Sequence, residues 1–230
     1  MSKHGMSSQL ARIKKKLGSA EEVKFNAYFS TATPSSEAEN MNYSGPSADC
    51  YVNVEKYKKI IISKLRNIND FSVSLKSGYT MQFHLGNIEE LSEKSKVKIN
   101  RNQKGQTCIK HNKSFSEQEK HLKSYNFWNK YLGKGRLLCI NDKKGNYKFF
   151  RMDEVINLII KSTSWRILPT GRIKGSVIIN DKKYTIFTFE MRTDKNQFVL
   201  GAHGGENGKR FELFLNENLK YCLISPEQKN

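Results

Sequence analysis

The sequence has few cysteines, and they are far apart. Its 230 residues contain four, and no two of them form a C-x-x-C pair. This spacing argues against a structural zinc ribbon and against a dense disulfide framework. Cys108 and His111 have a C-x2-H spacing, but no second pair of ligands follows, so we expect no metal there. The cysteines are Cys50, Cys108, Cys139 and Cys222.

The sequence also lacks a long hydrophobic run. No stretch approaches the roughly 18 consecutive apolar residues of a membrane-spanning helix. The N-terminal stretch MSKHGMSSQLARIKKK has no apolar segment of the kind found in secretory signals. We therefore expect a soluble, cytoplasmic protein that does not enter a membrane.

Acidic residues are scarce relative to basic ones. Asp and Glu total 22 against 40 Lys and Arg, which gives a formal net charge of +18. So large a charge repels itself in the folded chain unless a polyanion neutralises it. Nucleic acid is the commonest such partner, and the basic residues are spread along the chain. Ribosomal and other structural basic proteins share this signature, so charge indicates nucleic-acid binding without indicating a mechanism.

Hydrophobic periodicity predicts an α/β fold. Helices are expected at residues 19–29, from residue 114 or 116 to residue 132, and from residue 153, whereas residues 57–65 fit either a helix or a strand. Turn residues between apolar runs favour a larger share of strands towards the C-terminus. Strands are expected at 49–54, 71–76, 137–140 and 147–150, within 167–192, and at 196–205 and 210–216.

The first candidate site combines Asp49, Ser74 and Lys76. Side chains alternate along a strand, so Ser74 and Lys76 face the same way in FSVSLK. Asp49 follows a Ser-Gly-Pro turn and begins another strand, which permits the three residues to converge. Metal-dependent cleavage of a phosphodiester needs a carboxylate for the ion and a cation near the phosphate. The backbone carbonyl of Leu75 could coordinate the same metal, although a strand lysine that only meets solvent is the simpler interpretation.

At these residues the chain resembles the PD-(D/E)xK type II restriction endonucleases, and among them the small enzymes that cut GCGC-type sites. FSVSLKSGYTMQFHL places Lys76 at the family's lysine and Gln82 at its Gln-Phe pair. NYSGPSADCYVN is similar to the family's strand entry, with Asp49 as the metal carboxylate. The resemblance covers residues 42–86 and, more loosely, residues 165–217.

Ser74 departs from the family pattern, because it stands where the family has Glu or Gln. Three interpretations remain open. The metal could be held by Asp49, the Leu75 carbonyl and water. A further acid, Glu22, could assist from the first predicted helix. Cleavage could also have been lost.

The resemblance implies a restriction-endonuclease-like mixed sheet flanked by helices. It places a catalytic region in residues 1–136 and a β-rich, basic DNA-recognition region in residues 137–230, which could also form one compact unit. It implies Mg2+-dependent cleavage of double-stranded DNA at a short specific sequence within a restriction–modification system. A homodimer suits symmetric cleavage, although a monomer can nick each strand in turn.

Several polar residues are candidates for contacting DNA. Arg and Lys match guanine edges, and Asn and Gln match adenine edges, but most contacts go to the phosphate backbone. We expect Arg192 and Gln197 to read bases, whereas Gln82 would orient Lys76 or touch DNA. The full set in the C-terminal part is Arg172, Lys174, Arg192, Asn196, Gln197, His203 and Arg210.

Two other functions fit the same sequence. One is a sequence-specific DNA-binding module that keeps a nuclease-like scaffold without cleavage. The other is a structure-selective repair nuclease, which would cut junctions or mismatches with little base preference.

Overall fold

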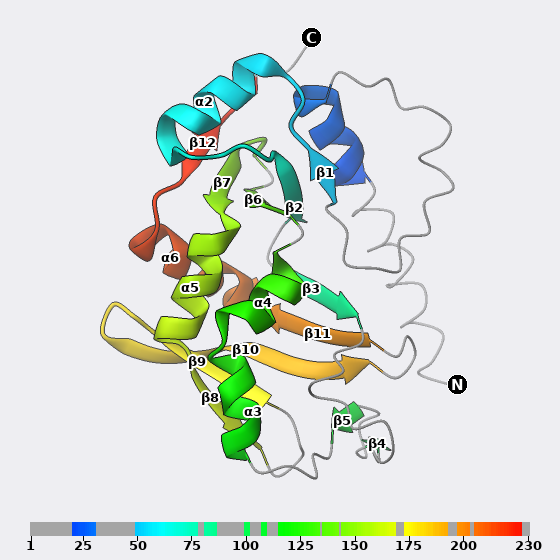
Figure 1. Cartoon of the computed structure of the whole chain (residues 1–230), viewed down its shortest axis with the longest axis vertical. Helices are drawn as coiled ribbons and strands as arrows, with labels where there is room; N and C mark the ends of the chain where they lie inside the picture. Colours follow the sequence, from blue (N-terminus) through cyan, green and yellow to red (C-terminus); the bar gives the residue numbers. More distant parts are fainter. Residues whose placement is uncertain are drawn as a thin grey trace.

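The fold is given by a computed structural model, which describes residues 20–30, 49–77, 81–86, 99–101, 107–109, 115–133, 135–142, 144–168, 173–192, 197–202 and 205–226. This part of the chain contains six helices and two five-stranded sheets, together with a small two-stranded sheet. The expected α/β class is therefore confirmed. Figure 1 shows one large sheet above the other, with helices around both.

The first sheet is mixed. Its strand order is β1-β2-β6-β7-β12, and β2 runs antiparallel to β1 but parallel to β6. β6 and β7 form the expected hairpin, and β12 pairs with β7 as the edge strand opposite β1. The strands are β1 (Cys50–Tyr51), β2 (Ser72–Ser77), β6 (Leu137–Asn141), β7 (Tyr147–Arg151) and β12 (Cys222–Ile224).

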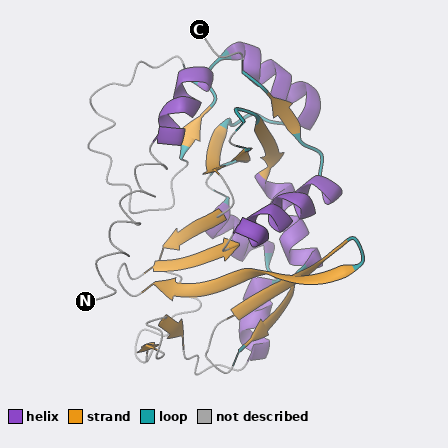
Figure 2. Cartoon of the chain, turned by 180° about the vertical axis from the view of Figure 1, so that it is seen from behind, coloured by secondary structure: helices purple, strands orange, loops and turns teal. Residues whose placement is uncertain are grey.

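The second sheet is antiparallel throughout, in the order β3-β11-β10-β9-β8. Its strands fan out in the lower half of Figure 2. They are β3 (Met81–Gly86), β8 (Ser164–Ile167), β9 (Ile173–Ile179), β10 (Lys182–Arg192) and β11 (Gln197–Ala202), while the small sheet pairs β4 (Ile99–Arg101) with β5 (Thr107–Ile109).

Helices cover both faces of the first sheet. A helix at residues 20–29, here called the first helix, packs with α2 against one face in a core that contains Phe25, Phe29 and Ile61. The opposite face shares a second core with α4, α5, α6 and the second sheet. The labelled helices are α2 (Glu55–Leu65), α3 (Phe115–Leu122), α4 (Tyr125–Leu132), α5 (Met152–Ser162) and α6 (Gly205–Asn218).

The predicted division at residue 136 does not separate the two sheets. β1 and β2 precede it, yet they pair in one sheet with β6, β7 and β12, which follow it. β3 likewise joins the second sheet, whose other strands all come from the C-terminal part. Both sheets contribute to one continuous core, in which Leu138 of the first sheet and Phe83 of the second take part.

The structure corrects two expectations about single elements and resolves a third that the sequence left open. Residues 210–216 are helical rather than a strand, because Phe211, Phe214 and Leu215 have helical spacing and form one buried stripe of α6. The single helix expected up to residue 132 is two helices. Ser124 caps α4, since its hydroxyl accepts a hydrogen bond from the Phe127 amide at 3.5 Å. Residues 57–65 belong to the helix α2.

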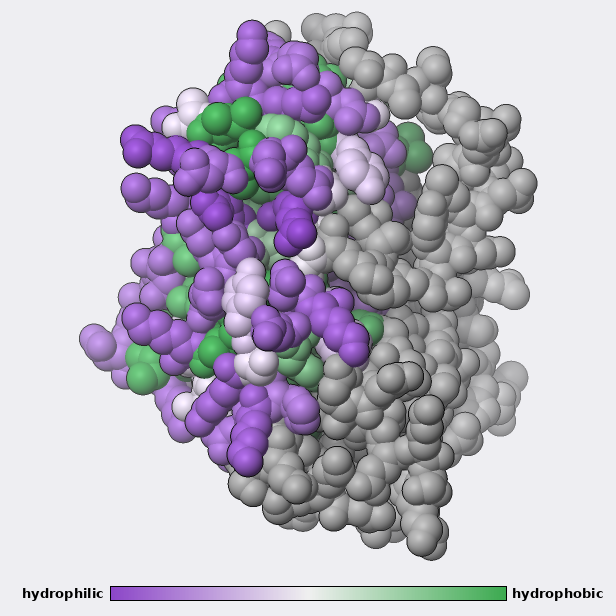
Figure 3. All heavy atoms as spheres, viewed as in Figure 1, coloured by the Kyte–Doolittle hydropathy of each residue, from purple (hydrophilic) through white to green (hydrophobic). Residues whose placement is uncertain are grey.

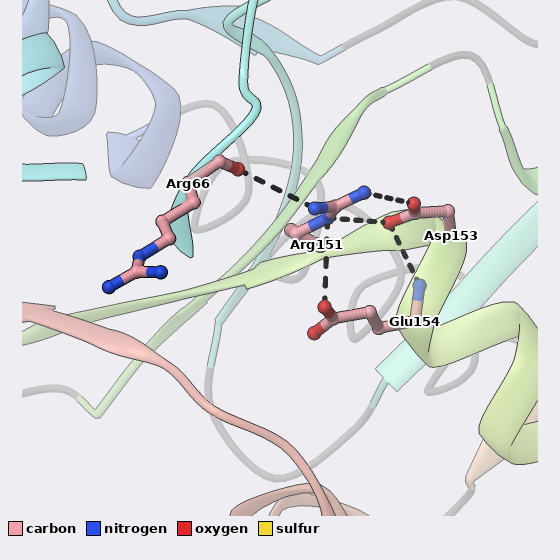
Figure 4. Close-up of polar contacts among 4 residues, drawn as sticks. All are labelled: Arg66, Arg151, Asp153 and Glu154. Carbon is pink, nitrogen blue, oxygen red and sulfur yellow. Dashed lines mark hydrogen bonds and ion pairs between the residues drawn. The ribbon is translucent and has the colours of Figure 1, made fainter. Parts of the chain in front are cut away.

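A polar cluster fixes the connection that leads into β2 (Figure 4). Arg151 forms a two-pronged ion pair with Asp153, lies 3.7 Å from a Glu154 oxygen, and donates to the Arg66 carbonyl at 3.5 Å. Arg66 has a φ of 47°, a strained value for a residue with a side chain. The Arg151 hydrogen bond lowers the pKa of Asp153, so this pair stabilises the fold above the ordinary carboxyl pKa and loses its contribution as the pH falls through the lowered value.

Hydrophilic side chains cover most of the described part of the face in Figure 3. Within the described residues, no helix combines the length and the apolar character needed to cross a bilayer.

Candidate functional site

β2 presents two different faces, as its alternating sequence predicts. Val73 and Leu75 are buried in the core beneath the first helix and α2. Ser74 and Lys76 therefore lie on the other face of the strand. The site begins with these two residues, near the carboxyl end of β2.

Asp49 is the residue that the other residues of the site contact. It directly precedes β1, and its backbone N–H donates to the Val73 carbonyl at 2.9 Å. Its Oδ2 accepts three hydrogen bonds: from the Leu75 amide at 2.8 Å, from Lys76 Nζ at 3.0 Å and from Ser74 Oγ at 3.3 Å. The structure thus brings Asp49, Ser74 and Lys76 to one point.

The Lys76 ammonium lies between two oxygen atoms. Besides Asp49 Oδ2, it donates to the Leu75 carbonyl at 3.1 Å, and it lies 5.2 Å from the centre of the Phe83 ring on β3. The side chains of Lys76 and Asp49 are only 14% and 34% exposed, so water screens their attraction incompletely. These two oxygens are the ligands that the sequence predicts for a metal.

Glu22 lies on the first helix and is electrostatically coupled to the same group. Partial burial raises the pKa of Glu22, the Asp49 charge raises it further, and the Lys76 ammonium opposes both effects. The pKa of Cys50, which follows Asp49, is also raised, by burial and then by the Glu22 and Asp49 charges. The charges of Glu22 and Asp49, which belong to different elements, therefore influence each other at this end of the sheet.

The donor set fits a hard divalent cation. Carboxylate and carbonyl oxygens are the ligands that Mg2+ prefers, and Mg2+ usually keeps several waters. Among the described residues, no three His, Cys, Asp or Glu side chains gather closely enough to hold a metal ion. A cation here would be held by Asp49, Glu22 and the Leu75 carbonyl, with water completing its shell.

Gln82 lies on β3 opposite Gly201 of β11. Its neighbour Phe83 faces the core and contacts Lys76, so Gln82 projects from the other face of β3. This placement does not favour the expected contact with Lys76. A contact with DNA stays a prediction.

The DNA-contact candidates are spread over the C-terminal part. Lys174 on β9 donates to the Thr188 hydroxyl at 2.6 Å. Arg210 lies on α6, where its guanidinium packs 4.8 Å from the Tyr184 ring and pairs with Glu206 at 3.1 Å. Arg192 and Gln197 face each other as backbone partners at the end of the β10–β11 ladder. Arg172, Asn196 and His203 lie outside the described residues.

Three further residues lie around the site, and sequence reasoning did not single them out as part of it: Asn141, its partner Glu21, and Gly135. Asn141 ends β6 beside Ser77 of β2, and its Nδ2 donates to Glu21 of the first helix at 2.5 Å. Gly135 precedes β6, and a Cβ added there would lie 2.6 Å from the Ser74 backbone nitrogen. The only signals in the sequence are a polar residue ending the apolar run LLCI and a glycine just before it.

Comparison with known proteins gives no relative from which a function could be taken. No protein-family model, no curated protein and no solved structure matches the chain.

Proposed function

We propose that the protein is a Mg2+-dependent endonuclease that cuts double-stranded DNA at a short specific sequence, as type II restriction enzymes do. One observation carries this proposal: near the end of β2, Lys76 Nζ lies 3.0 Å from Asp49 Oδ2 and 3.1 Å from the Leu75 carbonyl oxygen. The net charge of +18 suits a polyanionic substrate.

The arrangement of strands around the site supports a restriction-endonuclease-like fold. The strand that carries Lys76 is antiparallel to the strand entered through Asp49 and parallel to β6 on its other side. The carboxyl ends of β2 and β6 meet at one edge, which is where ligands bind in open α/β sheets. Helices lie on both faces, as the resemblance implies.

Each residue has a distinct role in the proposed reaction. Asp49, the Leu75 carbonyl and Glu22 would hold Mg2+, which when bound polarises a phosphate oxygen and lowers the pKa of a water. Lys76 is already desolvated against Phe83, and its charge would stabilise the negative charge that develops on the scissile phosphate. Ser74 would orient the Asp49 carboxylate through its hydroxyl.

Digestion of plasmid DNA tests the proposal directly. With Mg2+, the purified protein should yield discrete fragments, and a chelator should prevent them. Cutting that requires junctions or mismatches would instead indicate a repair nuclease. Sedimentation of the protein with a cut-site duplex would report whether it acts as a homodimer.

Ser74→Ala should slow cleavage by ~10- to 100-fold, the scale expected when a partner of a metal-binding carboxylate is lost. DNA affinity should hardly change, because Asp49 Oδ2 keeps its bonds from Leu75 and Lys76. Single-turnover cleavage at several Mg2+ concentrations measures the effect. Loss of cleavage as complete as that of Asp49→Ala would make Ser74 a primary ligand or nucleophile, contrary to this assignment.

A second candidate function is a sequence-specific DNA-binding module without cleavage. One observation favours it: Ser74 offers only a hydroxyl where the family that the chain resembles has the longer Glu or Gln, so the site has fewer strong ligands. Tight and specific binding of a duplex with no cleavage in Mg2+ or Mn2+ would establish this function in place of the first.

A further inference from the structure

The first helix makes a specific polar contact with the edge of the first sheet. Asn141 Nδ2 donates to Glu21 Oε2 at 2.5 Å, across 120 positions of the sequence. Asn141 is 3% exposed, so this hydrogen bond to a carboxylate is sheltered from water. A charge-assisted bond of this kind is stronger than one between neutral groups.

Glu21 lies on the same face of the helix as its buried aromatic residues. Glu21 and Phe25 are four residues apart and therefore share one face. Phe25 and Phe29 are fully buried, stack on each other, and contact Tyr147 and Phe149. Aromatic packing holds the end of the helix at Phe25 and Phe29, whereas the Glu21–Asn141 bond holds its first turn.

Glu22 is the neighbour of Glu21 and lies on a different face of the helix. Successive residues of an α-helix are about 100° apart around the axis. Glu21 is turned towards Asn141, and Asn141 is the register partner of Ser77, which follows Lys76 on β2, so the first turn lies at the carboxyl end of β2. The Asp49 and Lys76 charges both act on Glu22, which agrees with this placement. The orientation of Glu22 therefore depends on the first turn, where helices fray most easily.

We propose that Asn141 is a positioning residue: through its hydrogen bond to Glu21 it fixes the first turn of the helix and so holds the Glu22 carboxylate beside Asp49 for binding a divalent cation. This inference rests on the proposed metal site. It gives a site in which Ser74 contributes only a hydroxyl a second carboxylate, which is supplied by a helix and held in place by the neighbouring strand β6.

The bond is best removed from the Glu21 side, because Asn141 is buried within a strand. The full-length protein without DNA is titrated with Mn2+ by calorimetry. Glu21→Ala should weaken Mn2+ binding about tenfold, as loss of a supporting partner does. Glu21→Gln removes the charge but keeps an oxygen that accepts from Asn141, so it should bind Mn2+ nearly as the wild type does. Lys24→Ala, which removes the ammonium that lies 3.4 Å from Glu21 Oε1 and leaves the Asn141 bond in place, is the matched control and should leave binding unchanged.

A double mutant separates positioning from a general loss of stability. In a Glu22→Gln background, Glu21→Ala should cause no further loss of Mn2+ affinity, because the carboxylate that it positions is already gone. Circular dichroism would confirm that each variant is folded. If Glu21→Ala binds like the wild type, or if its loss adds in full to that of Glu22→Gln, the inference is overturned.

The same titration distinguishes this inference from the proposed function. Weaker binding by Asp49→Asn together with unchanged binding by Glu21→Ala would overturn the positioning role alone. Wild-type protein that binds no Mn2+, or an Asp49→Asn variant that binds as well as the wild type, would overturn the metal site and the positioning role with it.

Discussion

Lys76→Met is expected to abolish DNA cleavage while making the protein bind Mg2+ more tightly. Methionine has a similar length and no charge, so it can fill the space beside Phe83 without the ammonium. Cleavage should fall by ~1000-fold or more, because a fixed charge near the developing phosphate charge is worth several kcal/mol.

The opposite change in metal binding follows from where the ammonium lies. Lys76 Nζ contacts Asp49 Oδ2 at 3.0 Å and the Leu75 carbonyl at 3.1 Å, so it occupies the place where the proposed cation would bind. Metal binding must displace it. Removal of this competing charge from a partly buried pair should tighten Mg2+ binding by about tenfold.

Calorimetric titration and single-turnover cleavage measure the two effects on the same preparation. Asp49→Asn is the matched comparison, since it should lose both cleavage and metal affinity. If Lys76→Met and Asp49→Asn change metal binding in the same direction, the ammonium does not compete with the cation. Cleavage by Lys76→Met at the wild-type rate would remove Lys76 from the reaction.

The alternation of FSVSLK was enough to predict how β2 presents its residues. Apolar side chains at Val73 and Leu75 and polar ones at Ser74 and Lys76 define the two faces, and the structure follows them. The sequence permitted the approach of Asp49 but did not require it, and the resemblance to a nuclease family singled this residue out. Local patterns and this resemblance together therefore gave the centre of the candidate site.

The surroundings of the site could not be predicted in this way. Asn141 meets Glu21 only because β6 lies parallel to β2, and that pairing crosses a long segment with weak local signals. Residues 210–216 of α6 read as a strand in the sequence because FELFL is too short a pattern to separate the two periods. Contacts between distant segments depend on topology, and one sequence carries little information about topology.

Gly135→Ala should damage both stability and cleavage. An added Cβ would lie 2.6 Å from the Ser74 nitrogen and 2.9 Å from the Val73 carbonyl carbon, and both are backbone atoms that cannot rotate away. Overpacking of this kind costs about 1–3 kcal/mol of unfolding free energy. Because β2 must shift at Ser74, the bonds from Ser74, Leu75 and Lys76 to Asp49 should be disturbed as well.

Gly175→Ala separates these two effects. Its Cβ would lie 2.7 Å from the Trp165 ring and 2.8 Å from a Thr163 methyl group, within the second sheet and its core. It should lower stability to a similar degree without moving β2. At a temperature at which both variants are folded, Gly135→Ala should cleave ~100-fold more slowly than Gly175→Ala, because small misplacements of catalytic groups are that costly. Thermal unfolding and single-turnover cleavage measure the two quantities, and equal cleavage rates would mean that β2 absorbs the added methyl group without moving the site.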